Sequence, residues 1–165
     1  MQMKLELVAI PVSDVDRAKA FYVDKLGFNP DHDHKVSEDL RFVQLTPEGS
    51  ACSIVIGTGI TGAAPGSVEG VQMVVEDIDA VHAELTSRGV EISEIQDMPW
   101  GSFIFFADPD GNRWALQQIV PQRPAIAIGI GEEDERAPWQ SLGVAADRAA
   151  WDDVVGTSIE AHRIS

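Results

Sequence analysis

A long internal repeat constrains the fold of this 165-residue chain more than any other feature of its sequence. Asp14 and Asp77 each precede a short amphipathic segment, and they stand 63 positions apart. A turn containing Pro, an acidic residue and Gly begins at Thr46, and a similar turn begins 62 positions later at Asp108. A period of this length is too long for a short-period solenoid. It predicts two copies of one module whose sheets pack together.

The first copy, expected over residues 3–57, predicts the order strand, helix and then three strands. The apolar run 5–12 is typical of a buried strand that ends near a proline. Asp14 is the expected N-cap of the helix that follows, and Gly27 is expected to end that helix in a left-handed conformation. Two further strands are expected at about 29–36 and 39–45, and the last strand should follow the turn at Thr46.

The second copy, expected over residues 70–120, repeats this order. Asp77 is its expected N-cap, and Gly89 should end the helix. Its strands are expected in the run "VQMVV", at about 90–96, at about 102–107 and after the turn "DPDGN". Residues 58–69 are rich in Gly and small residues and suit a linker. The fold class is therefore α+β, with one domain over residues 1–120.

Residues 121–165 lie outside the repeat and form a C-terminal extension. A short amphipathic helix is expected there at about 143–155. Three roles stay open for this segment: packing on the domain, exchange onto a partner chain, or partial mobility.

Charge and apolar pattern exclude several classes of partner. The formal net charge is −15, which repels nucleic acids and anionic membranes and mildly favours a cationic ligand. No apolar run approaches the roughly 18 residues of a membrane-spanning helix. The first residues lack the features of a signal peptide, so a cytoplasmic location is expected. Cys52 is the single cysteine, so an internal disulfide is excluded. We expect Cys52 to be a small buried residue in a strand.

Three stretches carry a resemblance to a known family: "VAIPVSDVDRAKAFYVDKLGF", "VVEDIDAVHAELTSRGV" and "WGSFIFFADPDGNRWAL". In this order they resemble the glyoxalase/bleomycin-resistance/dioxygenase superfamily, also called the vicinal oxygen chelate fold. The resemblance implies two tandem βαβββ modules that form a U-shaped mixed sheet around a cleft. It also implies a homodimer, because a partner chain often completes such clefts in this family.

Metal-dependent members of that family hold a divalent ion with His, Glu or Gln side chains from the first and last strands of each module. The matching positions here are Leu7, Ser53, Gly70 and Ala115, and none is a normal ligand for a catalytic ion. A shift of one residue would bring Glu6, Cys52, Glu69 and Trp114, but such a shift turns each side chain to the opposite face of its sheet. We therefore expect no metal and no other cofactor.

Family members without these ligands include antibiotic-sequestering proteins, in which the cleft holds a small molecule. A binding cleft needs apolar and aromatic walls with a few polar groups. Counting by twos along the strands gives the residues whose side chains could line the cleft. A simpler interpretation stays open for each type: the phenylalanine could belong to the core, and the glutamines could lie at a sheet edge or on the surface. The predicted ligand-binding residues are Leu7, Ser53, Gln72, Trp100, Phe103, Arg113, Ala115 and Gln117.

The histidines offer a weaker alternative. His32 and His34 are two residues apart, so on a strand they would point to the same face. They could hold a metal ion adventitiously, but a solvated hairpin is the favoured interpretation.

The preferred function is metal-independent binding of a small organic molecule, cationic or aromatic, in the manner of a resistance or sequestration protein. Two other classes stay open. One is a glyoxalase-like lyase or isomerase, or a dioxygenase, with a displaced metal site or metal-free acid/base chemistry. The other is a regulatory module whose C-terminal segment docks on a partner.

Overall fold

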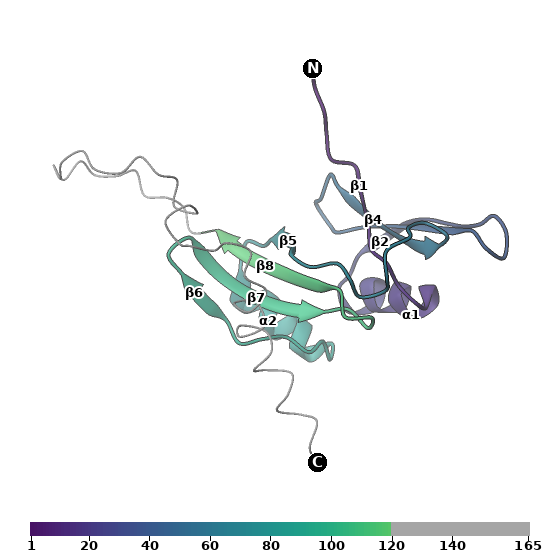
Figure 1. Cartoon of the computed structure of the whole chain (residues 1–165). Helices are drawn as coiled ribbons and strands as arrows, with labels where there is room; N and C mark the ends of the chain where they lie inside the picture. Colours follow the sequence, from purple (N-terminus) through teal and green to yellow (C-terminus); the bar gives the residue numbers. More distant parts are fainter. Residues whose placement is uncertain (120–165) are drawn as a thin grey trace, which may run out of the picture. The chain divides into compact units, whose positions relative to one another are not determined.

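The computed structural model describes residues 1–119, and along them one order of elements occurs twice (Figure 1). The first module contains β1 (Leu7–Ala9), α1 (Val15–Ala20), the π-helical segment η1 (Phe21–Lys25), β2 (Asn29–Lys35), β3 (Arg41–Thr46) and β4 (Ser53–Thr58). The second contains β5 (Val71–Val74), α2 (Ile78–Ser87), β6 (Gln96–Met98), β7 (Gly101–Ala107) and β8 (Arg113–Ile119). The predicted α+β class and the duplicated βαβββ order are confirmed. The predicted extension, with its helix at 143–155, lies outside the described residues.

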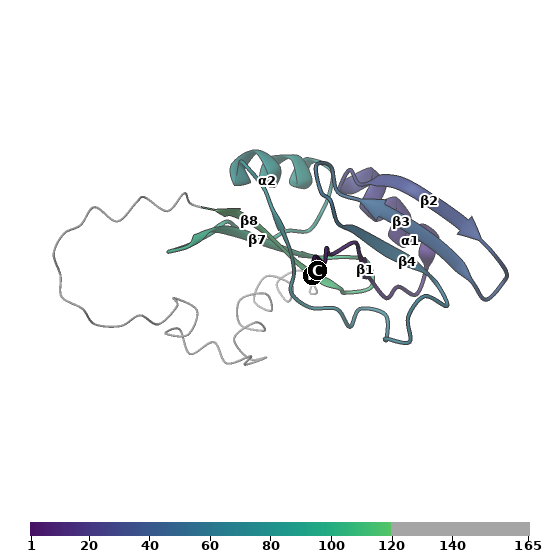
Figure 2. The ribbon, with the colours of Figure 1, turned by 90° about the horizontal axis from the view of Figure 1, so that it is seen from above.

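Each module forms its own four-stranded mixed sheet, and the two strand orders match (Figure 2). The orders are β1-β4-β3-β2 and β5-β8-β7-β6. The first strand of each module runs parallel to the last, and the other neighbours are antiparallel. The first and last strands are therefore adjacent in both modules, so the two copies of the repeat share one topology.

Both helices begin and end where the sequence predicts. Asp14 accepts a hydrogen bond from the backbone nitrogen of Arg17, and Asp77 accepts one from that of Ala80, each at 3.0 Å. These are the N-caps that an Asp before a helix supplies. Gly27 and Gly89 follow the two helical segments with φ of 76° and 71°, the left-handed conformation that glycine adopts at little cost.

The first helix differs from expectation in its second half, where α1 widens into the π-helical segment η1. The backbone nitrogen of Leu26 bonds to the carbonyl of Phe21, five residues earlier. Two consecutive aromatic residues then face the core: Phe21 lies 6.3 Å from Phe106 and Tyr22 lies 5.8 Å from Trp114 between ring centroids. We attribute the wider turn to this double aromatic contact.

The prediction of a strand at 90–96 is wrong for most of these residues. Within that range, the isolated bridge between Ile92 and Phe106 precedes β6, which starts only at Gln96. Ser93 accounts for the interruption, because its hydroxyl accepts a hydrogen bond from the backbone nitrogen of Phe105. A side chain thus takes the place of a backbone carbonyl in the ladder.

The core lies on the helix side of both sheets and is continuous between the modules. It contains, among others, Tyr22, Leu45 and Ile56 from the first module and Ile104 and Trp114 from the second. Burying large aromatic and aliphatic side chains in one cluster supplies most of the stabilisation of a domain of this size. Residues 1–119 accordingly form one unit.

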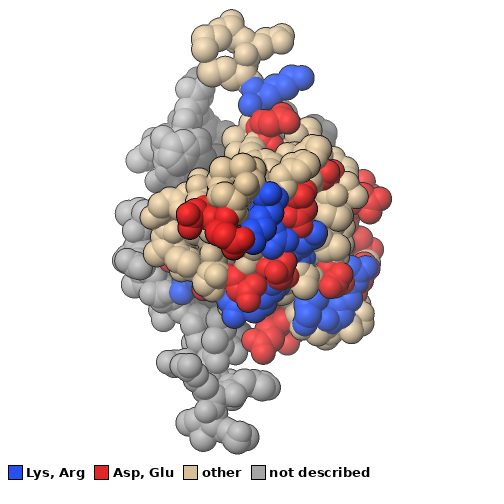
Figure 3. Space-filling model, turned by 90° about the vertical axis from the view of Figure 1, so that its right-hand side faces the viewer, with Lys and Arg blue, Asp and Glu red and all other residues tan. Residues whose placement is uncertain are grey.

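Acidic and basic side chains alternate on the surface over α1, β2 and β3 (Figure 3). Arg41 contacts Asp33 at 2.9 Å and Asp16 at 2.8 Å, and Lys19 contacts the same Asp33 at 2.8 Å. Hydrogen bonds from Arg41 and then from Lys19 hold the pKa of the Asp33 carboxyl well below its usual range. Part of the large negative charge is thereby paired. None of the helices in residues 1–119 is long and apolar enough to cross a bilayer.

Candidate functional site

Each sheet has one face against its helix and one face pointing away, which we call the helix-free face. Strand alternation assigns each residue to a face. Val43 and Leu45 belong to the core, so Gln44 and Thr46 point to the helix-free face of the first module. Trp114 and Leu116 are likewise in the core of the second module. The side chains between and beside them therefore point the other way.

The helix-free face of the first module carries both polar and apolar side chains. Strand register aligns a row across all four strands: Ala9, Val55, Gln44 and His32. A second row starts with Leu7 and Ser53, which are register partners, and continues to Thr46. The predicted positions Leu7 and Ser53 thus lie side by side on the face expected for them.

Ser53 is the centre of a hydrogen-bond network on this face. Its hydroxyl is buried, accepts a bond from Gln44 Nε2 at 3.0 Å and lies 2.6 Å from Thr46 Oγ1. Thr46 also donates to a carboxylate oxygen of Asp31. The network fixes the orientation of an amide, two hydroxyls and a carboxylate, which is how binding surfaces hold polar groups ready for a ligand.

The helix-free face of the second module is aromatic and apolar. Phe103 and Phe105 are stacked, with ring centroids 6.2 Å apart and planes 7° apart. Ala115 is the register partner of Phe105 and leaves room beside the rings because its side chain is a single methyl group. The prediction that Phe103 and Phe105 share a face, with Phe106 on the other, is confirmed.

Two glutamines connect this aromatic face to Trp100 at the edge of the sheet through hydrogen bonds. Gln72 Nε2 donates to Gln117 Oε1 at 2.5 Å, and Gln117 Nε2 donates to the backbone carbonyl of Trp100 at 3.0 Å. Trp100 is 40% exposed at the turn between β6 and β7. The structure therefore connects three of the predicted ligand-binding residues through one chain of hydrogen bonds.

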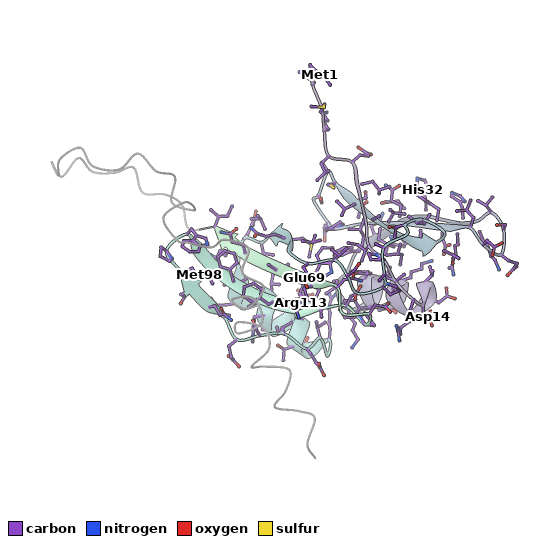
Figure 4. The ribbon with its side chains drawn as sticks, in the orientation of Figure 1. Met1, Asp14, His32, Glu69, Met98 and Arg113 are labelled. Atoms are coloured by element: carbon purple, nitrogen blue, oxygen red, sulfur yellow. The ribbon has the colours of Figure 1, made fainter. Side chains whose placement is uncertain are left out.

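Arg113, also among the predicted residues, begins β8 (Figure 4). Strand alternation places it on the same side as Ala115. Its backbone nitrogen donates to the carbonyl of Val68 at 2.9 Å, which ties the linker to the second sheet.

The register corrects one position. The sequence pairs Gly70 with the first-strand position of module one, but Gly70 precedes β5. Gln72 is the register partner of Ala115, as Leu7 is of Ser53. The cause is the connection from strand to helix, which spans residues 10–14 in the first module and only 75–77 in the second.

The family's metal positions are therefore Leu7, Ser53, Gln72 and Ala115, and only Gln72 among them has a side chain of the types that metal-dependent members use as ligands. Leu7 and Ala115 have no donor atom. The Ser53 hydroxyl and the Gln72 amide are neutral and take part in the hydrogen bonds described above. Among residues 1–119, no group of three or more His, Cys, Asp or Glu side chains is arranged to hold an ion.

A cavity of about 560 Å³ lies on the other side of the second sheet, between β5, α2 and the end of η1. Its lining includes the apolar side chains of Phe28, Leu85 and Phe106. Of the predicted ligand-binding residues, Gln72 alone contributes to it. Its rim cation, Arg88, is engaged by Glu84 and by the carbonyl of Lys25. We place the candidate site on the helix-free faces, where the predicted residues gather.

Sequence reasoning missed several residues of the first helix-free face: Gln44, Thr46 and Asp31. The alternation of the run "RFVQLT" contained a signal for the first two, because a buried Val43 and Leu45 imply the opposite face for their neighbours. Cys52, expected to be buried, is partly exposed.

A duplicated βαβββ fold with adjacent first and last strands in each module defines a protein of the paired-module class. The chain belongs to the Glyoxalase/Bleomycin resistance protein/Dioxygenase superfamily, whose family model matches residues 4–116.

Several solved structures and a curated relative are similar to this chain over nearly their whole length. TnmS3, an antibiotic binding protein from Streptomyces sp. CB03234, is 35% identical with a TM-score of 0.67, covering 72% of this chain and 98% of that one. A superfamily member from Sphaerobacter thermophilus DSM 20745 is 33% identical with a TM-score of 0.63, covering 71% and 98%. The uncharacterised protein YetH of Bacillus subtilis (strain 168) is 30% identical over 122 residues, covering 72% of this chain and 100% of the relative.

Proposed function

We propose that this protein binds a small organic molecule on its helix-free faces without a metal ion, in a sequestration or resistance role. The observation that carries the proposal is the contrast between the two faces. One carries a fixed hydrogen-bond network around the buried Ser53, and the other carries the stacked, largely buried rings of Phe103 and Phe105. A planar ligand with polar substituents matches this pair of surfaces. The similarity to an antibiotic binding protein supports the same class of ligand.

The charge distribution favours a neutral or cationic molecule over an anionic one. Asp31 is exposed beside the Ser53 network, and the chain as a whole carries a formal charge of −15. A cation approaching the polar face would meet an attractive field.

The proposal includes a homodimer. β1 and β5 are edge strands of their sheets, and unpaired edges are surfaces that a second chain can cover. Val74 on β5 is 61% exposed and Trp100 is 40% exposed, which leaves apolar surface beside the candidate site. A second copy could bring a polar face of one chain opposite an aromatic face of the other. We propose that this dimer acts in the cytoplasm.

A ligand screen tests the proposal. The full chain, treated with EDTA, is heated with a panel of cationic and aromatic natural products, and unfolding is followed by dye fluorescence. A specific ligand should raise the Tm in EDTA, because binding to the folded state alone stabilises it. The shift should be reduced in Gln44→Leu and Phe103→Leu and kept in Ser102→Ala, whose side chain alternates to the other face of β7.

Two outcomes would contradict the proposal. One is a ligand whose stabilisation appears only when a divalent metal is added. The other is turnover of the ligand by the wild-type chain, which would assign the protein to the enzymes of its superfamily. Size-exclusion chromatography with light scattering tests the dimer separately.

A further inference from the structure

The edge strand β2 turns two histidines onto the same face as the candidate site. Pro30 is the register partner of the core residue Leu45, whereas His32 is the partner of Gln44. A β-bulge between Pro30 and His32 causes the change, because two steps along β2 match one step along β3. Without the bulge, His32 and His34 would alternate to the same side as Pro30.

The helix-free position of the two imidazoles follows from their partners. His32 is opposite Gln44 and His34 is opposite Phe42, both on that face. Asp33, between them, points to the other side and contacts Lys19 of α1. Figure 4 shows His32 on the side of the sheet away from Asp14, which stands at the start of α1.

The two rings are close to each other and accessible. Their centroids are 5.6 Å apart, and both residues are exposed. Within the described residues neither imidazole has a hydrogen-bond or ion-pair partner. A shared ion with metal–nitrogen bonds of about 2.0–2.1 Å would hold two imidazole centroids roughly 5 Å apart in tetrahedral geometry. Rotation about the terminal torsions, which are broad for histidine, is the movement that would aim one nitrogen of each ring at a shared ion.

We infer that His32 and His34 form a two-imidazole site for a borderline transition-metal ion, of which Ni²⁺, Cu²⁺ and Zn²⁺ are the chemical candidates. Neutral imidazole is a good ligand for all three. The site differs in position from the four family positions, because it uses an edge strand that contributes none of them. Two protein ligands leave the remaining coordination positions to water or to oxygen and nitrogen atoms of a small chelating molecule.

The experiment uses Ni²⁺ alone as the probe, with the tag-free full chain titrated by calorimetry. Wild type should bind one ion per chain at this site. His32→Ala and His34→Ala should each weaken binding at least tenfold, and the double variant should abolish it. His82→Ala, which removes a histidine on α2, is the matched control and should bind as wild type does. Because β2 is exposed along its whole length, equal Tm values for all variants should show that the fold is kept.

Nuclear magnetic resonance locates the ion independently. Paramagnetic Ni²⁺ should broaden the amide signals of β2 and of Phe42 and Gln44 first. Absence of uptake by wild type, unchanged uptake by the double variant, or broadening centred elsewhere would each overturn the inference. The outcome is separable from the proposed function, which is measured in EDTA and predicts ligand binding in the double variant.

Discussion

Tyr22 donates a hydrogen bond to Asp108 Oδ2 at 2.7 Å and so joins the helical segment of the first module to a turn of the second. Both residues are buried, and Trp114 Nε1 approaches the same phenol oxygen at 3.3 Å. Burial, followed by the charge of Asp108, raises the pKa of the Tyr22 phenol far above its usual range. The phenol therefore stays protonated and remains a donor. This contact, with the continuous core, fixes how the two sheets meet within residues 1–119.

We expect Tyr22→Phe to destabilise the fold by about 1–2 kcal/mol, because a buried carboxylate loses a donor and a buried indole loses an acceptor. Urea denaturation followed by fluorescence measures the change. Ser87→Ala removes a hydroxyl bond on the exposed side of α2 and serves as the control, with an expected change below about 0.5 kcal/mol. Equal effects of the two substitutions would contradict the role assigned to Tyr22.

Asn112 makes a second connection between the modules, and its substitution should lower the stability more than that of Tyr22. Its side-chain amide donates to the carbonyl of Pro11 at 2.9 Å and to Asp108 at 2.7 Å, and its oxygen accepts from the nitrogen of Val68 at 3.1 Å. Asn112→Ala leaves several buried groups without partners, so a loss of about 2–3 kcal/mol is expected. The same denaturation experiment measures it, and a loss smaller than that of Tyr22→Phe would be inconsistent with this hydrogen-bond set.

The ion pairs of Asp33 should make the stability of the fold depend on pH. Hydrogen bonds from Arg41 and then from Lys19 lower the pKa of Asp33 in the folded state. Its contribution to the free energy of unfolding is therefore fully present above the unfolded-state pKa of about 3.9. Asp33→Asn should therefore cost about 1 kcal/mol at pH 7, since the pairs are partly exposed. The difference from wild type should stay constant down to about pH 4 and shrink as the pH falls further. Asp16→Asn, a change at an exposed end of the network, should cost less.

Substitution of Gly57 tests how closely strands β3 and β4 approach each other. A methyl group at this position would lie 1.9 Å from the carbonyl oxygen of Arg41. Gly57→Ala should thus lower the stability by at least about 1–3 kcal/mol through overpacking. Gly62→Ala meets no atom within 4 Å and should be close to neutral. A tolerated Gly57→Ala would show that the strand pair is looser than described.

Local signals predicted the helices and the duplicated order because caps and turns depend on neighbouring residues. Asp14, Asp77, Gly27 and Gly89 all act as the sequence indicates. Alternation likewise placed Phe103 and Phe105 on one face, since it needs only the two-residue period of a strand.

Long-range register was not predictable in the same way. The shorter connection before α2 moves the matching position from Gly70 to Gln72, and only the pairing with Ala115 reveals it. The bulge at Asp31 has a similar effect, because it changes the face of His32 without any change in the sequence pattern around it. Whether the predicted residues bind a ligand stays a prediction.

Ligand binding by this protein should need no metal ion. The most direct test is calorimetric titration of the ligand from the thermal screen into the full chain, first in EDTA and then with Ni²⁺, Co²⁺, Zn²⁺ or Mn²⁺ added. We expect the same Kd in EDTA and with each ion, and weaker binding by Phe103→Leu. Binding that vanishes in EDTA and returns with an ion would contradict this expectation and would show that the ligand is held through a metal ion.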